Sequence, residues 1–461
     1  MAQYIPRHAA PRNKNISKHR AAALSLTALL SLSMAPATAN ETAPLTENSQ
    51  AVQEAEVLIQ EALTDRGNNP ADIYKAAPET LVNETFYDAP AHLPTANGAL
   101  IKKETFSFKV DANNIIAHPV AQAQRIMYKS TDHQGNPVAV TGTALTTTKP
   151  WGGPGERPII ALAPGTQGIG DSCAPSNQFG AGSEYESLVI TALLNAGYNV
   201  VVTDYIGLGT EGTHSYLNRV DQGNAVLDAA RAATATDLGL GSRTSPIGLW
   251  GYSQGGGAVA SAGELQASYA PELNLKGIYA GAVPADLQAV TTFIDGGLYT
   301  GFSLMGVAGL ADSYGLDLSD KLSAEGQAAL EAVRHQCTGE AITTFGFKNT
   351  RILTASGQTL AQEMMTDPQI AHIVAQNNLG QQGRHPQVPI LIASSWADDV
   401  IPYQINRQLA ADYCQQGADV TFYTLAGVGH APGIFEGIPG GLIFMDRQFK
   451  ELPNINSCWQ F

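Results

Sequence analysis

The chain of 461 residues is poor in several residue types that identify common classes of protein. Its four cysteines are too few for a fold built on disulfides, and no two of them have the spacing of a zinc site. Only 15% of the residues are charged, whereas 44% are hydrophobic, which is the ordinary mix of a globular protein with a sizeable core. The sequence has no internal repeat, and its length fits one large α/β domain with an insertion, or two domains.

The apolar segment AAALSLTALLSLSM near the amino terminus is too short to cross a bilayer comfortably. Five basic residues precede it, and the small-residue sequence Ala37-Thr38-Ala39 follows it. These features are typical of a secretory signal, which we expect at residues 1–39 with cleavage after Ala39. The protein is therefore predicted to be secreted, either extracellular or in the cell envelope.

Basic residues become scarce once this signal is removed. Residues 1–39 hold five basic and no acidic side chains, which leaves 21 basic against 41 acidic residues and a net charge of −20. A surface that negative repels nucleic acid and anionic lipid headgroups, so we expect no nucleic-acid partner. In an oxidising compartment Cys173, Cys337, Cys414 and Cys458 are predicted to form two disulfides, for which three connectivities can be drawn.

Short apolar segments alternate with helical segments over most of the chain after residue 100. The first segments show the two-residue alternation of β-hairpins, and the later ones are apolar throughout, as buried strands are. We expect strands within 104–110, 123–130, 138–147, 157–164, 198–207, 245–253, 275–286, 387–399 and 419–427, and helices within 187–197, 223–239 and 255–269. This order predicts an α/β fold, with a mostly parallel sheet covered by helices on both faces.

One gap in this alternation is too long for a single helical crossover. It marks residues 289–383 as an insertion, which we interpret as a mainly helical cap over the edge of the sheet where the parallel strands end. A plain structural insertion is the alternative. The insertion divides the core into residues 101–288 and 384–461, and residues 40–100 form an amino-terminal extension with one helix expected around 51–63.

A glycine-rich segment at Gly207–Gly212 matches the G-x-G-x-x-G pattern of dinucleotide-binding sites. That pattern must open a helix and be followed by an acidic residue about 20 positions later. Here the glycines lead into the polar segment THSYLNRVD, so we expect no dinucleotide. We expect no other cofactor and no metal.

The segment GYSQG at residues 251–255 fits the pattern G-x-S-x-G and lies between an expected strand and an expected helix. In a nucleophile elbow the serine lies on a strained turn, and glycines on both sides avoid a clash. We therefore predict Ser253 as the nucleophile and the N–H of Gln254 as an oxyanion donor, aided by the positive end of the helix. The second donor is expected in the loop after an earlier strand, at Thr166 or Gln167.

A base and an acid must follow the serine, with the acid first. Histidine titrates near neutral pH, and His430 is the only histidine after Pro386. It lies in the glycine-rich segment AGVGHAPG, which we expect to be a loop beyond the last strand. Asp398 and Asp399 follow the preceding strand, and either carboxylate could orient the imidazole; we prefer Asp398.

With these residues the chain resembles the secretory lipases, a family of fungal and actinobacterial enzymes with the α/β-hydrolase fold. The resemblance runs from about Phe86 to the carboxyl terminus and rests on FYDAP, APGTQG, DSCAPS, VVTDYIGLG, GYSQGG, GVGHAPG and the D-x-x-x-P segment Asp398–Pro402. It implies hydrolysis of carboxylic esters, including triacylglycerols, by a Ser–Asp–His triad beneath a helical cap. It also favours Asp398 as the acid.

The same resemblance implies further roles for residues outside the triad. Two disulfides follow from it, Cys173–Cys337 and Cys414–Cys458. It makes Asp171 a candidate member of the oxyanion hole. One departure concerns Gln254, because some fungal members have glycine after the nucleophile; the glutamine side chain is expected to narrow that side of the pocket.

Within the expected cap, residues 292–311 are rich in large apolar side chains and glycine. These side chains would suit an acyl groove and the paired glycines a movable lid, although the same residues could form the core of the cap. The candidates for substrate binding are Phe293, Leu298, Tyr299, Phe302, Leu304 and Met305.

Together these residues predict a secreted lipase or carboxylesterase that works through an acyl-enzyme without metal or cofactor. One alternative is a cell-envelope acyltransferase with the same triad. Another is a non-catalytic envelope-binding protein on a hydrolase scaffold, against which the complete triad argues. We expect a small-molecule or lipid ester as substrate, transient contact with a lipid interface, and a monomer.

Overall fold

The structure is a computed structural model that describes residues 50, 52–54, 56, 57 and 83–461. The predicted signal, residues 1–39, lies outside these residues. Most of the helix expected around 51–63 also lies outside them, although the described positions in its first half are helical.

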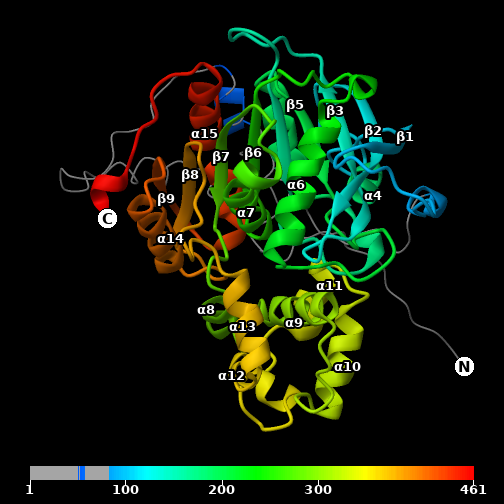
Figure 1. The fold of residues 1–461 in the computed structure, drawn as a ribbon, viewed down its shortest axis with the longest axis vertical. Coiled ribbons are helices and arrows are strands. Elements are labelled where there is room, and N and C mark those ends of the chain that lie inside the picture. Colours follow the sequence, from blue (N-terminus) through cyan, green and yellow to red (C-terminus); the bar gives the residue numbers. More distant parts are fainter. Residues whose placement is uncertain (1–49, 51, 55, 58–82) are drawn as a thin grey trace, which may run out of the picture. The chain divides into compact units, whose positions relative to one another are not determined.

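Nine strands of the described chain form one sheet (Figure 1). They are β1 (Leu100–Thr105), β2 (Val120–Thr131), β3 (Pro137–Thr147), β4 (Ile159–Ala163), β5 (Asn199–Thr203), β6 (Ile247–Tyr252), β7 (Leu275–Gly281), β8 (Ile390–Ala397) and β9 (Val420–Val428). Their order is β1-β2-β3-β5-β4-β6-β7-β8-β9. The three pairings from β1 to β5 are antiparallel and the five from β5 to β9 are parallel, which confirms the predicted mostly parallel sheet.

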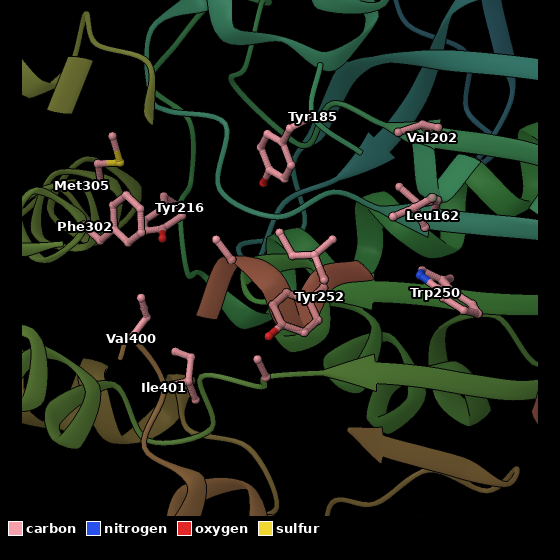
Figure 2. Close-up of a cluster of buried hydrophobic side chains, with 14 of the residues drawn as sticks. Leu162, Tyr185, Val202, Tyr216, Trp250, Tyr252, Phe302, Met305, Val400 and Ile401 are labelled. Atoms are coloured by element: carbon pink, nitrogen blue, oxygen red, sulfur yellow. The ribbon is translucent and has the colours of Figure 1, made fainter. Parts of the chain in front are cut away.

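Helices cover both faces of this sheet. Those outside the insertion are α4 (Pro175–Ala181), α5 (Ser187–Asn195), α6 (Arg219–Ala233), α7 (Gln254–Tyr269), α14 (Tyr403–Gln415) and α15 (His430–Phe449). On one face α5 and α15 pack with Leu162, Val202 and Trp250, which Figure 2 shows along their strands. On the other face α6, α7 and α14 pack with Ala161 and Val201. Because successive strand residues point to opposite faces, burial of both faces explains why these strands are apolar throughout.

Helix α15 departs from the prediction of a glycine-rich loop around His430. The loop is only Gly429, and the helix begins at His430 and continues for 20 residues. Gly433, Gly437 and Gly441 recur one helical turn apart, and a Cβ at each would collide with an aromatic side chain of β6 or β7. These glycines allow close packing of the helix on the sheet, so their abundance does not indicate a loop here.

The chain between β7 and β8 forms a separate group of helices, which we call the inserted helices. They are α8 (Leu287–Ile294), α9 (Thr300–Tyr314), α10 (Ala324–Val333), α11 (Thr338–Phe345), α12 (Leu360–Met365) and α13 (Pro368–Asn377). Figure 1 shows them together beyond one end of the sheet. Helix α9 packs against α8, α10 and α11, so it forms the centre of the group.

Two disulfides join distant parts of the chain, Cys173–Cys337 and Cys414–Cys458. This is the pairing that the family resemblance implied. The first links the short 3-10 helix η2 (Asp171–Cys173) to the residue before α11, and the second links α14 to η5 (Cys458–Gln460). The remaining short helices are η1 (Glu84–Phe86), η3 (Thr236–Leu238) and η4 (Thr350–Leu353). Among the described helices, none combines the length and the apolar character needed to cross a membrane.

Candidate active site

Ser253 is the single residue between β6 and α7. Its backbone has φ 59° and ψ −122°, a strained conformation for a residue other than glycine. A Cβ at Gly255 would collide with the carbonyl oxygen of Ala163, and a Cβ at Gly251 would collide with the carbonyl of Gly255. Both glycines of the motif are therefore required, and the turn has the geometry of a nucleophile elbow.

His430 and Asp398 form a buried pair. His430 Nδ1 lies 2.8 Å from Asp398 Oδ2 and 3.0 Å from Asp398 Oδ1. Asp398 Oδ1 also accepts the N–H groups of Val400 and Ile401, each over 2.8 Å. A carboxylate held in this way orients the imidazole so that Nδ1–H donates and Nε2 is the proton acceptor.

The neighbouring aspartate has a different partner. Asp399 Oδ1 accepts the backbone N–H of His430 over 2.7 Å, at the positive end of α15. The Tyr252 hydroxyl donates to the carbonyl oxygen of His430 over 2.9 Å, and the two rings are 5.1 Å apart. Because Tyr252 directly precedes Ser253, these contacts place His430 beside the elbow.

The loop after β4 also lies against the elbow. The Gly165 N–H donates to Glu186 Oε1 over 2.5 Å, and a Cβ at Gly165 would lie 3.2 Å from the Tyr252 carbonyl oxygen. The Thr166 carbonyl accepts from the Tyr185 hydroxyl over 3.1 Å. Burial raises the pKa of Glu186 to about 8. No motif in the sequence marked this buried carboxyl group, although it holds the loop that the prediction singled out.

Thr166 and Gln167, the two candidates for the second oxyanion donor, direct their side chains differently. The Thr166 hydroxyl is hydrogen-bonded to the Tyr216 hydroxyl over 2.7 Å, and Tyr216 lines the pocket described below. The Gln167 side chain instead lies in a buried network with Glu184 and Gln178. Among the described residues, neither backbone N–H has an acceptor. Of the two candidates, Thr166 is therefore the one whose side chain contacts a residue of the pocket wall.

Asp171 lies in a different surface depression from Ser253. Its carboxylate accepts the Gly209 N–H over 3.2 Å, and the depression is also lined by Glu211 and His335. Burial raises the pKa of Asp171. The structure thus does not bring Asp171 to the pocket that contains Ser253, and its position gives the oxyanion role no support.

A histidine that no motif marked holds the side chain of Gln254. Gln254 Nε2 lies 2.8 Å from His214 Nε2, and His214 Nδ1 lies 3.1 Å from the carbonyl oxygen of Ile206. Burial lowers the pKa of His214 to about 4, so the ring is neutral at pH 7. The ring then accepts from Gln254 and donates to Ile206. In the sequence His214 lies in a segment that indicated only a polar loop.

Ser253 opens into a narrow pocket whose walls are almost entirely apolar. The sheet side of the pocket includes Tyr216, Gln254, Val400 and Ile401. Figure 2 shows Phe302 of α9 next to Tyr216, with Val400 and Ile401 facing the same space. The inserted helices supply most of the remaining wall, including Val290, Ile294, Gly306, Leu310, Met364, Ile370 and Ile373.

Of the six candidates for substrate binding, Phe302 lines this pocket. Leu298, Tyr299 and Met305 pack in the hydrophobic core, and Phe293 is 50% exposed on α8. Leu304, the sixth large side chain of that segment, is also buried in the core. The alternative interpretation, a core for the inserted helices, thus describes most of these residues.

The periodicity of α9 explains why the pocket residues were hard to identify. Nearly every position from Thr300 to Ala311 is apolar or small, so the sequence has no contrast between one helix face and another. The face that lines the pocket carries Phe302, Gly306 and Leu310, spaced one turn apart. Only the packing of α9 against its neighbours determines which face this is.

Comparisons with known proteins agree with this geometry. The sequence model of the secretory lipase family matches residues 174–457, more than half of the chain. A secreted triacylglycerol lipase of Malassezia restricta is 28% identical over 396 residues, which cover 82% of each chain. Lipase A of Moesziomyces aphidis is 27% identical over 394 residues, which cover 81% of each chain.

Solved structures show the same likeness. The closed state of Candida antarctica lipase A has a TM-score of 0.70 and 25% identity, over 82% of this chain and 89% of that one. A rice cell wall degrading esterase from Xanthomonas oryzae shares the fold with a TM-score of 0.62 and 18% identity, over 77% of this chain and 100% of that one. The protein is thus an α/β-hydrolase, and this chain belongs to the secretory lipase family.

Proposed function

We propose that this protein is a secreted lipase or carboxylesterase that hydrolyses carboxylic esters, with triacylglycerols as the leading substrate class. The observation that carries the proposal is the strained Ser253 in an apolar pocket, beside a buried His430–Asp398 pair tied to the same strand. Family membership and the printed names of the relatives support the same reaction.

In the proposed mechanism His430 Nε2 takes the hydroxyl proton of Ser253 as Ser253 Oγ attacks the ester carbonyl carbon. Asp398 stabilises the imidazolium that forms. The N–H groups of Gln254 and Thr166 donate to the oxyanion of the tetrahedral intermediate. Collapse of this intermediate passes the proton to the departing alcohol and leaves an acyl-enzyme, which water activated by His430 then hydrolyses to the free acid.

We assign the acyl chain to the apolar pocket between Ser253 and the inserted helices. Most of the residues that line this pocket are apolar, and each CH₂ group buried there would contribute about 0.8 kcal/mol. The insertion, residues 289–383, then serves as a cap that binds the acyl chain. The two parts of the core, residues 101–288 and 384–461, carry the reacting groups.

Replacement of Ser253 by alanine tests the mechanism. Hydrolysis of p-nitrophenyl butyrate by Ser253→Ala should fall by about 10⁵-fold or more, and covalent labelling by a fluorophosphonate should disappear. Ser268→Ala is the matched control on the exposed side of α7, and it should keep both activities. If Ser253→Ala hydrolysed the ester as fast as the wild type, Ser253 would not be the nucleophile.

We propose in addition that the inserted helices touch a lipid–water interface transiently and that the protein acts as a monomer. Three large apolar side chains of this part of the chain are exposed: Phe293 by 50%, Phe347 by 73% and Ile352 by 49%. Large apolar side chains exposed to solvent can bind another apolar surface.

Flotation with a triolein emulsion stabilised by zwitterionic lipid tests this contact. Phe347→Ser should bind the emulsion less while it hydrolyses a dissolved short-chain ester at the wild-type rate, because Phe347 lies outside the pocket. Equal flotation of both proteins would contradict the assignment of this surface. Sedimentation equilibrium tests the monomer, and a stable dimer at micromolar concentration would exclude it.

A further inference from the structure

The inserted helices contact the oxyanion loop directly as well as the pocket. Thr338, the first residue of α11, donates its hydroxyl to the Thr166 carbonyl oxygen over 2.7 Å. Its backbone N–H donates to the Gln167 carbonyl oxygen over 2.9 Å. The Ile169 N–H in turn donates to the carbonyl oxygen of Gln336 over 3.0 Å. The segment before α11 thus runs along the loop in a short β-like pairing.

Two glycines make this close approach possible. Gly168 has φ +128°, and a Cβ there would lie 2.5 Å from Cys337 Cα. A Cβ at Gly170 would lie 2.8 Å from the carbonyl carbon of His335. The disulfide Cys173–Cys337 closes the same contact a few residues further along the loop. The loop and the segment before α11 are therefore fixed to each other by backbone, side-chain and covalent links.

These links hold Thr166, whose backbone N–H we propose as the second donor to the oxyanion. The Thr166 carbonyl has two donors, the Tyr185 hydroxyl from the core and the Thr338 hydroxyl from α11. The Thr166 side chain is held by Tyr216. A donor stabilises a developing oxyanion only when its direction is fixed before the reaction, since reorientation during the reaction costs free energy.

We propose that Thr338 is a positioning residue for the oxyanion loop, so that the insertion that covers the substrate also orients one oxyanion donor. This inference rests on the proposed function. Thr338 does not line the pocket, so it acts through Thr166 and does not touch the substrate. Its loss should weaken transition-state stabilisation and leave binding of the ester unchanged.

Thr338→Val removes the hydroxyl and keeps the shape of the side chain. The Thr166 carbonyl would still accept from Tyr185, and the backbone N–H of residue 338 would still donate to Gln167, so the variant should fold. Complete loss of an oxyanion donor costs about 10²–10³ in kcat, and loss of one of two anchors of the donor should cost less, about tenfold, with KM unchanged. The reaction rate with a phosphonate ester, which mimics the tetrahedral intermediate, should fall in parallel.

Two further variants separate positioning from a general structural effect. Thr338→Ser restores the hydroxyl and should recover most of kcat. Thr343→Val, on the exposed side of the same helix and bonded only within it, should match the wild type in kcat, KM and thermal midpoint. A kcat for Thr338→Val within about twofold of the wild type, or a serine variant as slow as the valine variant, would overturn the proposal.

The results for Ser253→Ala and Thr338→Val distinguish an error in the positioning role from an error in the proposed function. If Ser253→Ala is inactive while Thr338→Val equals the wild type, the reaction assignment holds and the positioning role is wrong. If Ser253→Ala retains full activity, the proposed nucleophile is wrong. In that case Thr338→Val could still lose activity tenfold. If its rate of reaction with the phosphonate ester were unchanged, Thr338 would have no role in positioning the oxyanion donor.

Discussion

The edge of the sheet and the inserted helices form opposite walls of one pocket, but different physical constraints fix their residues. At the sheet edge each candidate residue follows a strand directly: Ser253 on its strained turn, Asp398 after β8, and His430 one residue after β9. In the inserted helices the wall consists of apolar side chains such as Phe302 and Leu310, whose identity matters less than their volume.

This difference separates the chemistry from the choice of substrate. A hydrogen bond of 2.8 Å between His430 and Asp398 allows little substitution, because both the distance and the proton position matter. A wall of aliphatic side chains tolerates exchanges that conserve volume, each of which usually costs less than about 1.5 kcal/mol of stability. We expect changes at the sheet edge to stop the reaction and changes in the inserted helices to alter which ester reacts.

The largest expected effect is at Asp398. Asp398→Asn should lower kcat for p-nitrophenyl butyrate by about 10⁴-fold, because an amide in place of the carboxylate favours the wrong tautomer of His430. The matched control is Asp399→Asn, which keeps a side-chain oxygen that can accept the His430 N–H and loses only the negative charge at the start of α15, so it should lower kcat less than about tenfold. Equal losses in the two variants would show that Asp398 has no special role.

Sequence and structure agree where local rules determine position. The G-x-S-x-G pattern between a strand and a helix was enough to locate the turn at Ser253. Chain order selected His430 and the neighbouring pair Asp398 and Asp399, and the family resemblance favoured Asp398, which makes the contact seen in the structure. The same reasoning missed that His430 begins α15, because glycines that pack under aromatic rings look like loop residues.

Where position depends on tertiary packing, the sequence was less informative. It could not show that Phe302 lines the pocket while Met305 lies in the core, since α9 is apolar on nearly every side. It could not find Glu186 or His214 either. Each is a single titratable residue without a motif, and only the folded chain brings it to the oxyanion loop or to Gln254.

An intermediate effect is expected in the inserted helices, at Gly306. A Cβ at Gly306 would have Leu217 Cδ1 as its nearest neighbour, 3.4 Å away, so α9 tolerates a side chain there that projects into the pocket. Gly306→Leu should exclude several CH₂ groups of a long acyl chain. At about 0.8 kcal/mol for each, kcat/KM for a long-chain ester should fall about 100-fold, with little change for an acetyl ester.

A series of p-nitrophenyl esters of increasing chain length measures this effect. Thr292→Val, on the exposed side of α8 and bonded only within that helix, is the control and should leave the chain-length profile unchanged. A loss in Gly306→Leu that is equal for all chain lengths would mean that the pocket does not hold the acyl chain, and would remove the contrast between the two walls.

The smallest effect concerns His214, where the sheet edge depends on a residue that no motif marks. Burial lowers its pKa to about 4, and its ring faces the rings of Tyr205 and Tyr216 as well as the Gln254 amide. The neutral ring is thus favoured in the native protein, whereas the unfolded chain takes up the proton near pH 6.5. The free energy of unfolding should be at its full value above pH 6.5 and fall as the pH drops toward 4.

Urea unfolding at pH 7 and pH 5 measures this dependence in the wild type and in His214→Gln, which can keep both hydrogen bonds. One pKa unit corresponds to about 1.4 kcal/mol, so removing the histidine should reduce the loss of stability between these pH values by about 2 kcal/mol. Buried Glu186 and Asp204, whose pKa values burial raises to about 8 and about 6, favour the native state at low pH, but they do so equally in both proteins. His335→Gln, at a side chain that is 77% exposed, should follow the wild type. The same pH dependence in His214→Gln and the wild type would mean that the His214 ring is not kept neutral by burial, and that the Gln254 side of the pocket is held in another way.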